Sequence, residues 1–296
     1  MAQQPNVKKN DQESNKLQSV FALIAIPAII IIAELLFHFV MGNPSNFEGN
    51  DPNNHPHPGN YLGIVYKGGF IVPFLMSFFL MVITFSVERF ITITKASGSG
   101  SVANFVRAVK TALNNDDINA ALQHCDKQKG SVGNVIRATL LKYREMAELT
   151  KKERAGSAVL GNAPSGAIIV ADVADKEQKI AAIQKELEEA TSLELPMLEK
   201  NLTIIATLAS VATLVGLLGT VVGMIKAFAA IATAGAPDAV ALANGISEAL
   251  INTALGIAAS AFAIVFYNYF TSQIDTLTYS IDEIGVSITQ TYNSKF

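Results

Sequence analysis

The stretch Gly245-Ile-Ser-Glu248-Ala-Leu-Ile-Asn-Thr253-Ala-Leu-Gly256 carries one acidic residue near the start of an otherwise apolar run. No further charge follows until Asp275, so residues 249–274 are long enough to cross a bilayer as a helix. An ionisable group inside such a helix is costly and is therefore a candidate for function. The alternative is a carboxylate at the membrane surface, which a shift of one turn would expose to water. The stretch predicts a membrane protein that handles ions.

The composition of the whole chain favours a membrane protein and argues against other classes. Half of the 296 residues are hydrophobic, 16% are charged, and the mean hydropathy is +0.34. A net charge of −3, without a basic stripe, gives no reason to expect nucleic acid as a partner. Cys125 is the only cysteine, which excludes an internal disulfide. No nucleophile–base set or cofactor loop occurs, so neither an enzyme nor a cofactor is expected.

Four segments have the length of a membrane span, and we predict an all-α polytopic membrane protein. The predicted spans are 20–41, 68–94, 201–231 and 245–274. The first could be a cleaved signal peptide. We interpret it as a retained anchor, because its apolar core is long, contains Glu34 and is followed by no small-residue cleavage site.

The basic residues predict the orientation of these spans. Lysines precede the first span, most of the remaining Lys and Arg lie between Lys95 and Lys200, and the last connection has none. Positive residues tend to stay cytoplasmic, so both termini are predicted inside. The predicted cytoplasmic parts are the tail 1–19, a helical domain 95–200 and a helix 275–296. The predicted periplasmic loops are 42–67 and 232–244. In the first loop His55 and His57 could coordinate a metal ion, but a solvated loop without a metal is the better interpretation.

The cytoplasmic part is predicted to be helical, with long helices that continue from the spans. Ile274, Leu277, Ile281, Ile284 and Ile288 recur with a seven-residue repeat, which is typical of a helix that packs against another helix. Packing within the chain or self-association would both satisfy this pattern. Pro196 is predicted to kink or break the helix that leads into the third span.

The third and fourth spans each carry a face of small residues, which permits close approach of two helices in lipid. The glycines of these faces are Gly216, Gly219 and Gly223 on the third span and Gly245 and Gly256 on the fourth. A tight helix pair without a pore is one interpretation. The polar residues on or beside the same faces favour a polar-lined path for ions; they are Glu248, Thr253, Thr220 and Asn252.

Glu34, His38 and Lys226 are further ionisable residues in the predicted spans. Glu34 and His38 are spaced i,i+4 and could hydrogen-bond to each other inside the membrane, although water at the outer surface could also satisfy both. Lys226, at the outer end of the third span, is expected to extend outward to the surface. If its ammonium reached Glu248 instead, it would hold that carboxylate in its charged form.

Several motifs between residues 195 and 268 resemble those of the ExbB/TolQ/MotA proton-channel family, and the likeness is greatest to ExbB-like proteins. The motifs are Leu195-Pro-Met-Leu-Glu199-Lys-Asn-Leu202, Gly216-Leu-Leu-Gly-Thr220-Val-Val-Gly223, the stretch 245–256 and Tyr267-Asn268. Glu88-Arg89 also resembles the Glu-Arg pair that ends the preceding span in that family.

This resemblance implies a function and an assembly. ExbB-like proteins form a homopentamer in the bacterial inner membrane around an ExbD-like single-span partner, whose intramembrane Asp binds the travelling proton. The complex uses the proton-motive force to drive a TonB-like protein, which powers transport through outer-membrane receptors. The functional Glu of the family falls on Glu248 and its pore threonines fall on Thr220 and Thr253. The resemblance assigns Glu88, Arg89, Pro196 and Glu199 to the cytoplasmic mouth.

The sequence departs from the family pattern in two places and leaves the role within the family open. The anchor 20–41 is additional to the three spans of many ExbB-like proteins, and Phe262 stands where a proline is common. A TolQ-like role in envelope integrity and division is the main alternative, and a MotA-like stator is another. A purely structural membrane scaffold and sodium in place of protons also remain open.

Overall fold

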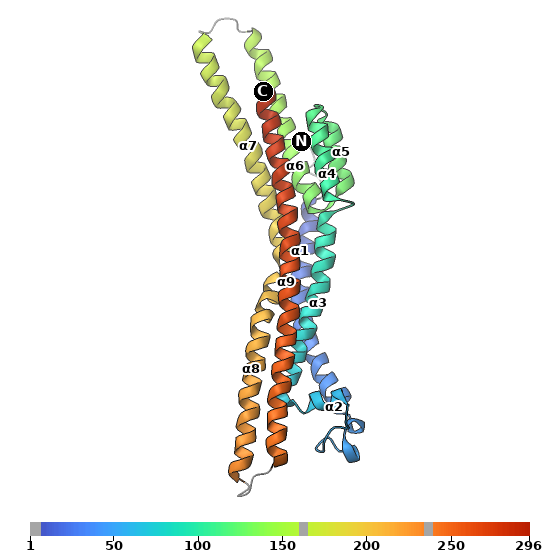
Figure 1. Cartoon of the computed structure of the whole chain (residues 1–296). Coiled ribbons are helices and arrows are strands. Elements are labelled where there is room, and N and C mark those ends of the chain that lie inside the picture. Colours follow the sequence, from blue (N-terminus) through green and yellow to red (C-terminus); the bar gives the residue numbers. More distant parts are fainter. Residues whose placement is uncertain (1–6, 160–164, 234–238) are drawn as a thin grey trace. The chain divides into compact units, whose positions relative to one another are not determined.

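The computed structural model describes residues 7–159, 165–233 and 239–296 and builds them mainly from α-helices (Figure 1). The helices are α1 (Val7–Leu35), α2 (Tyr61–Tyr66), α3 (Val72–Ser97), α4 (Val102–Asn114), α5 (Ile118–Gln128), α6 (Gly130–Val159), α7 (Ser165–Glu199), α8 (Leu202–Thr233) and α9 (Ala239–Lys295). The prediction of an all-α chain is confirmed.

In the described part of the chain, four helical stretches are long and apolar enough to cross a membrane, and the chain is a multi-pass membrane protein. The most apolar window lies in Phe21–Met41, with a mean hydropathy of 2.5, and the lowest of the four still reaches 2.0. The prediction of four membrane-capable helices is thus confirmed. The boundaries of the predicted regions stay predictions. Residues 1–6 of the predicted tail and 234–238 of the predicted loop 232–244 lie outside the described residues.

The described residues divide into two compact units, and each is considered by itself. The first unit comprises residues 1–88 and 201–269 and holds the apolar helices. Aromatic side chains from different helices pack against each other in this unit. Edge-to-face ring contacts of this kind add stabilisation beyond the burial of apolar area. Phe21 on α1 meets the fully buried Phe85 on α3 at 6.1 Å between ring centroids. Phe262 packs edge-on against Phe79 at 5.4 Å between ring centroids.

The segment between α1 and α2, predicted to be a solvated loop, is largely exposed and is held together by turn and cap hydrogen bonds. The side chain of Phe47 is fully buried there, beneath the ammonium of Lys67, which lies 5.5 Å from its ring centroid. Lys67 Nζ also donates to the carbonyls of Pro52 and Asn53 at 2.8 and 3.0 Å. Asn46 Nδ2 donates to Val40 O and Met41 O, which closes the end of the helix before it. The many Asn and Gly residues therefore supply turn and cap hydrogen bonds instead of an unstructured chain.

The second unit comprises residues 89–200 and 270–296 and contains α4 to α7 with the last part of α9. The seven-residue repeat of α9 is buried inside this unit: Ile274, Leu277, Ile281, Ile284 and Ile288 are each at most 4% exposed. Tyr292, one turn further, is also buried and shares a 2.8 Å hydrogen bond with Thr150 on α6. Of the two possibilities that the repeat left open, packing within the chain is the one observed.

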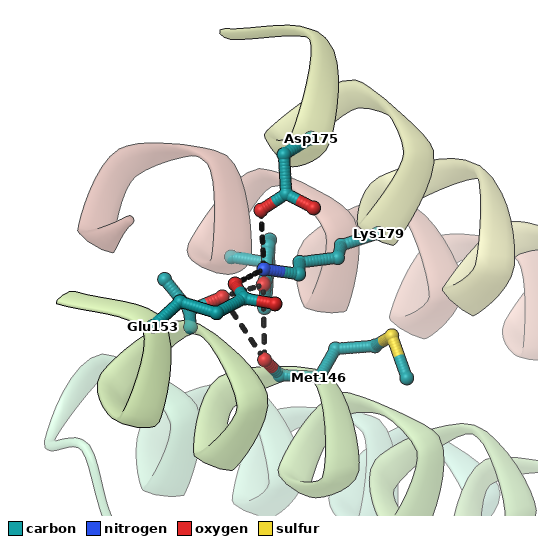
Figure 2. Close-up of polar contacts among 6 residues, drawn as sticks. Met146, Glu153, Asp175 and Lys179 are labelled. Carbon is teal, nitrogen blue, oxygen red and sulfur yellow. Dashed lines mark hydrogen bonds and ion pairs between the residues drawn. The ribbon is translucent and has the colours of Figure 1, made fainter. Parts of the chain in front are cut away.

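A buried lysine joins α6 to α7 in the second unit. Figure 2 shows the Lys179 ammonium between the carboxylates of Asp175, on its own helix, and Glu153, on α6. Burial lowers the pKa of Lys179, but its hydrogen bonds to the two carboxylates outweigh burial, and the pKa is raised overall. The ammonium therefore stays charged at physiological pH and fixes one helix to the other.

Candidate functional site

Helices α8 and α9 lie side by side in the first unit and approach each other through glycine (Figure 1). A Cβ added at Gly256 would come 2.7 Å from Ala212 O, and one added at Gly216 would come 3.0 Å from Asn252 O. Real Cβ atoms essentially never come within 3.0 Å of a heavy atom, so a larger residue at Gly256 would push the helices apart. Gly223 and Gly245 face each other in the same way further along. The predicted small-residue faces therefore form one helix–helix contact.

Asn252 is fully buried beside this contact. It occupies the space that a side chain at Gly219 would fill, and its Nδ2 donates to the Gly68 carbonyl at 2.9 Å. Its Oδ1 has no hydrogen-bond partner among the described residues. An amide oxygen buried without a partner is costly, which makes Asn252 an acceptor that is open to a donor such as water.

Glu248 lies one turn from Asn252 on α9 and forms an ion pair with Lys226 on α8. The distance from Lys226 Nζ to Glu248 Oε1 is 2.5 Å. The Glu248 side chain is 11% exposed and that of Lys226 is 49% exposed, so the pair has one buried and one accessible member. The prediction that Lys226 extends outward, away from Glu248, was wrong. In this position the Lys226 ammonium pairs with the buried charge of Glu248, which it would not reach if it extended to the membrane surface.

A short turn before α3 lies against this ion pair. Gly69 has φ +77°, in the left-handed region that favours glycine, and a Cβ there would come 2.5 Å from Glu248 Oε1. The next residue, Phe70, lies under the ammonium of Lys226, 5.7 Å from Nζ to the ring centroid. The backbone at position 69 therefore favours glycine, and a larger residue there would displace the Glu248 carboxylate.

The two threonines predicted to line a pore do not hydrogen-bond to Glu248. Thr220 Oγ1 donates to Leu217 O at 2.5 Å and Thr253 Oγ1 donates to Ala249 O at 3.2 Å, each within its own helix. Both side chains are partly exposed in the single chain. Each hydroxyl thus has its proton engaged while its oxygen lone pairs can still accept a hydrogen bond.

The residues predicted at the cytoplasmic mouth fall into two separate sets of contacts. In the first unit, Asn201 Nδ2 donates to Glu88 Oε2 at 3.1 Å. In the second unit, the fully buried Arg89 donates to Met197 O at 3.2 Å and to Leu198 O at 3.0 Å. These carbonyls lie in the last turn of α7, where no intrahelical N–H is available to them. Arg89 therefore caps the C-terminus of α7.

Pro196 does not end the helix that contains it. Helix α7 continues through Pro196 to Glu199, and α8 begins at Leu202, so the break falls at Lys200 and Asn201. The amide of Lys200 still bonds to the carbonyl of Pro196 at 3.1 Å. The break therefore lies after the proline, where Arg89 and Asn201 supply hydrogen bonds.

The sequence contained a signal for the Lys226–Glu248 pair that single-helix reasoning missed. The two residues are equally far in sequence from residue 237, in the middle of the connection between two spans. Consecutive spans joined by a short connection run antiparallel, so residues equidistant from the connection come level with each other. No comparable pattern marks the contact of Gly69 with Glu248, because it depends on tertiary packing of a distant turn.

Comparison with known proteins connects this site to a family. Residues 141–283 match the MotA/TolQ/ExbB proton channel family. The chain is similar to the biopolymer transport protein ExbB of Pseudomonas putida, with 30% identity over 147 residues, which cover 49% of this chain and 44% of that protein.

Two further relatives match shorter stretches. ExbB of Salmonella typhimurium is 34% identical over 84 residues, covering 28% of this chain and 34% of the relative. The Tol-Pal system protein TolQ of Pseudomonas aeruginosa is 35% identical over 103 residues, covering 35% of this chain and 45% of the relative. The chain spans less than half the length of each of these relatives.

Proposed function

Because the chain belongs to the MotA/TolQ/ExbB proton channel family, we propose that it is a proton-driven motor subunit of the bacterial inner membrane. Its partner is an ExbD-like single-span protein with an intramembrane Asp. Together they use the proton-motive force to move a TonB-like protein and energise transport across the outer membrane. The working unit is a homopentamer in membrane lipid, with both termini of each chain in the cytoplasm.

The observation that carries this proposal is the buried carboxylate of Glu248, held by Lys226 within an apolar helix pair. An intramembrane acid is expensive and is retained where it binds an ion or a proton. A lone carboxylate beside hydroxyl and amide groups suits a proton better than sodium, which requires several oxygen ligands. The family description, a proton channel, agrees with a transport or motor subunit and not with an enzyme.

Protonation of Glu248 provides the elementary step. A proton that binds Oε1 neutralises the carboxylate and removes its attraction for Lys226. The ammonium is then free to move, because its side chain is half-exposed in the single chain. When the proton leaves toward the partner's Asp, the carboxylate regains its charge and the ion pair re-forms. The proton is thus coupled to making and breaking one contact between α8 and α9.

The energy that one proton supplies is comparable to the energy needed to break the Lys226–Glu248 ion pair. One proton that crosses about 100 mV supplies roughly 2.3 kcal/mol. An exposed ion pair contributes up to about 1 kcal/mol, whereas breaking a fully buried one costs about 3–5 kcal/mol. The Lys226–Glu248 pair, with one buried and one half-exposed member, falls between these limits. One proton can therefore open one pair, and useful work requires many protons in a ring of subunits.

The other polar residues have supporting roles in this proposal. Thr220, Thr253 and Asn252 offer acceptor oxygens along the proton pathway. The glycines at positions 216, 219, 223, 245 and 256 allow α8 and α9 to approach each other closely. Glu88, Arg89, Pro196 and Glu199 are assigned to the cytoplasmic mouth, and in the second unit Arg89 holds the end of α7 in place.

A TolQ-like role is the second candidate. The similarity to a TolQ protein, at 35% identity, is as high as the similarity to ExbB proteins. Both roles use the same proton chemistry, so only the partner separates them. Purification of the tagged full chain from its native membrane identifies that partner by mass spectrometry. Recovery of a TolR-type protein together with a division defect on deletion would assign the TolQ-like role.

The proposal is tested in a deletion strain that expresses the full chain. We expect Glu248→Ala to abolish TonB-dependent uptake while the protein still accumulates and assembles, because the proton-binding group is gone. The adjacent substitution Ser247→Ala is the matched control and should leave uptake intact. Normal uptake with well-expressed Glu248→Ala would refute the proposed function.

A further inference from the structure

A cavity of about 640 Å³ in the first unit lies between α1 and the turn that precedes α3. Most of its lining is apolar, but Glu34, His38 and Tyr66 contribute polar side chains. Its lining also includes Gly69 and Phe70. Buried water needs two to four polar partners, and these three side chains can provide them.

Glu34 and His38 form a pair at the edge of this cavity. His38 Nε2 lies 3.1 Å from Glu34 Oε1, and both side chains are about half-exposed in the single chain. They belong to the candidate span Phe21–Met41, where ionisable groups are costly and mark ion or proton paths. His38 also lies in a π-helical turn, Leu36–Met41, a distortion that is frequent at functional sites.

Gly69 and Phe70 adjoin both the cavity and the Lys226–Glu248 ion pair. Gly69 lines the cavity, and Glu248 Oε1 lies against it, since a Cβ added at position 69 would come within 2.5 Å of that oxygen. Phe70 lines the cavity and also lies under the Lys226 ammonium. Because position 69 has no side chain, the buried carboxylate lies directly against a residue of the cavity wall.

We propose that this cavity is the outer access route for protons, in which the Glu34–His38 pair collects a proton and passes it beside Gly69 to Glu248. The inference rests on the proposed function and on the predicted orientation, which puts this end of α1 on the periplasmic side. His38 and Glu34 are positioned here as a relay, and neither needs to touch the partner protein.

The transfer balances without any further reactant. Neutral His38 takes a proton at a ring nitrogen from outer water, and the Glu34 carboxylate stabilises the imidazolium. The imidazolium releases the proton to water in the cavity, which delivers it to Glu248 Oε1, and His38 returns to its neutral form. The ionisable groups that face this route are Glu34, His38 and Tyr66 around the cavity, and Lys226 and Glu248 beyond Gly69. Imidazole is suited to this relay because each of its two ring nitrogens can take up or release a proton.

The experiment measures proton flux into proteoliposomes that contain the full chain with its copurified single-span partner. Two substitutions affect the route: His38→Gln removes the relay, and Ile31→Trp fills the cavity, whose wall includes Ile31. Ile24→Trp is the matched control, because Ile24 lies two turns away on the same face, is as exposed as Ile31 (61% against 60%) and does not line the cavity. Glu248→Gln reports separately on the proposed function.

We expect His38→Gln to reduce flux about tenfold or more when the outer pH is about 7.5, as for loss of a general acid–base group. At an outer pH of about 5 the reduction should shrink to about twofold, because abundant protons no longer need a collecting group. Ile31→Trp should reduce flux at both pH values and Ile24→Trp at neither.

The outcomes separate the two proposals. If Glu248→Gln abolishes flux while His38→Gln and Ile31→Trp conduct like the unmodified protein, the access route is wrong and the proposed function stands. If His38→Gln lowers flux equally at every outer pH, its role is structural and the relay is wrong. If Glu248→Gln conducts normally, the proposed function itself fails.

Discussion

Two of the lysine–carboxylate contacts among the described residues, one in each unit, distribute burial in opposite ways. In the first unit the carboxylate of Glu248 is buried and its partner Lys226 is half-exposed. In the second unit the lysine, Lys179, is buried and its partners Glu153 and Asp175 reach solvent (Figure 2). The buried member determines what happens when the contact opens, since it is the charge that water cannot easily compensate.

The Lys226–Glu248 contact is therefore suited to exchanging a proton, whereas the Lys179 contact is suited to holding two helices together. A buried carboxylate that loses its lysine is relieved by taking up a proton, which the membrane gradient supplies. A buried ammonium between two carboxylates keeps its proton, because its pKa is raised by hydrogen bonds to Asp175 and Glu153 that outweigh burial. We therefore expect substitutions at Lys226 to change transport and substitutions at Lys179 to change stability.

The largest effect is expected from Lys226→Met. It leaves the Glu248 carboxylate without a counter-charge, so Glu248 should hold its proton and stop cycling. We expect proton flux, measured with the partner protein, to fall by about tenfold or more. Removing one member of a buried ion pair costs about 3–5 kcal/mol, and the cost here is smaller because the lysine is half-exposed. Lys226→Arg should retain most of the flux, and Ile225→Met, an exposed neighbour, all of it. Full flux in Lys226→Met would show that the ion pair has no part in transport.

Lys179→Met should lower stability and leave transport unchanged. We expect a loss of about 1–3 kcal/mol in the free energy of unfolding, since the two carboxylates are exposed enough to be hydrated once the lysine is gone. Thermal unfolding of the full chain in detergent measures the loss, and proton flux per assembled complex is the second readout. A change in flux per complex would remove the distinction between the two clusters.

The pH dependence of the Lys179 contribution follows from its raised pKa. A raised folded-state pKa stabilises the folded chain below the unfolded value of about 10.4, and this stability is lost as pH rises through the folded value. Between about pH 5 and pH 9 the stability difference between Lys179→Met and the unmodified chain should therefore stay constant. A steep change within that range would show that Lys179 titrates there.

Thr220→Val and Thr253→Val should have mild effects. Each hydroxyl donates within its own helix, so loss of the hydroxyl should cost less than about 1 kcal/mol of stability. Flux should fall a few-fold at most, because only an acceptor oxygen along the path is lost. The double variant measured beside the single ones tests whether the two threonines act along one path. Complete loss of flux in either single variant would give that threonine a role as direct as that of Glu248.

The smallest effect concerns Cys125, a buried thiol in the second unit. Burial, followed by the nearby Asp126, raises its pKa to about 12. We expect no labelling by a maleimide at about pH 8 in the folded chain, since the thiolate is the nucleophile. Asn104→Cys, at an exposed position of α4, provides a labelled control in the same unit. Rapid labelling of Cys125 would show that this unit opens readily.

Patterns along a single helix made much of this architecture predictable. The seven-residue repeat of α9 indicated a buried stripe, and the residues Ile274 to Ile288 are buried as that spacing requires. The spaced glycines on α8 and α9 indicated a close contact, and they meet there. Both patterns recur with the period of an α-helix, so every further residue at that spacing strengthens the prediction of which helix face is buried.

Features that depend on two distant segments were not predictable in the same way. The contact of Gly69 with Glu248 joins residues far apart in sequence, and nothing local at Gly69 signals it. Arg89 resembled a family motif, but its role in capping the carbonyls of Met197 and Leu198 requires the packing of α7. Lys226 was assigned to the membrane surface because one helix was considered alone. Its partner Glu248 can be expected only when α9 is treated as an antiparallel neighbour of α8, since both residues are equally far from the connection between the helices.

The most direct measurement is the infrared difference spectrum of the full chain with its partner in lipid nanodiscs, recorded between acidic and alkaline buffer. A carboxyl group that binds a proton inside the membrane gives a protonated-carboxyl band. We expect that band in the unmodified protein, its loss in Glu248→Gln and its weakening in Lys226→Met, in which Glu248 holds its proton. An unchanged spectrum in Glu248→Gln would mean that Glu248 never exchanges a proton, which would contradict the function proposed for this site.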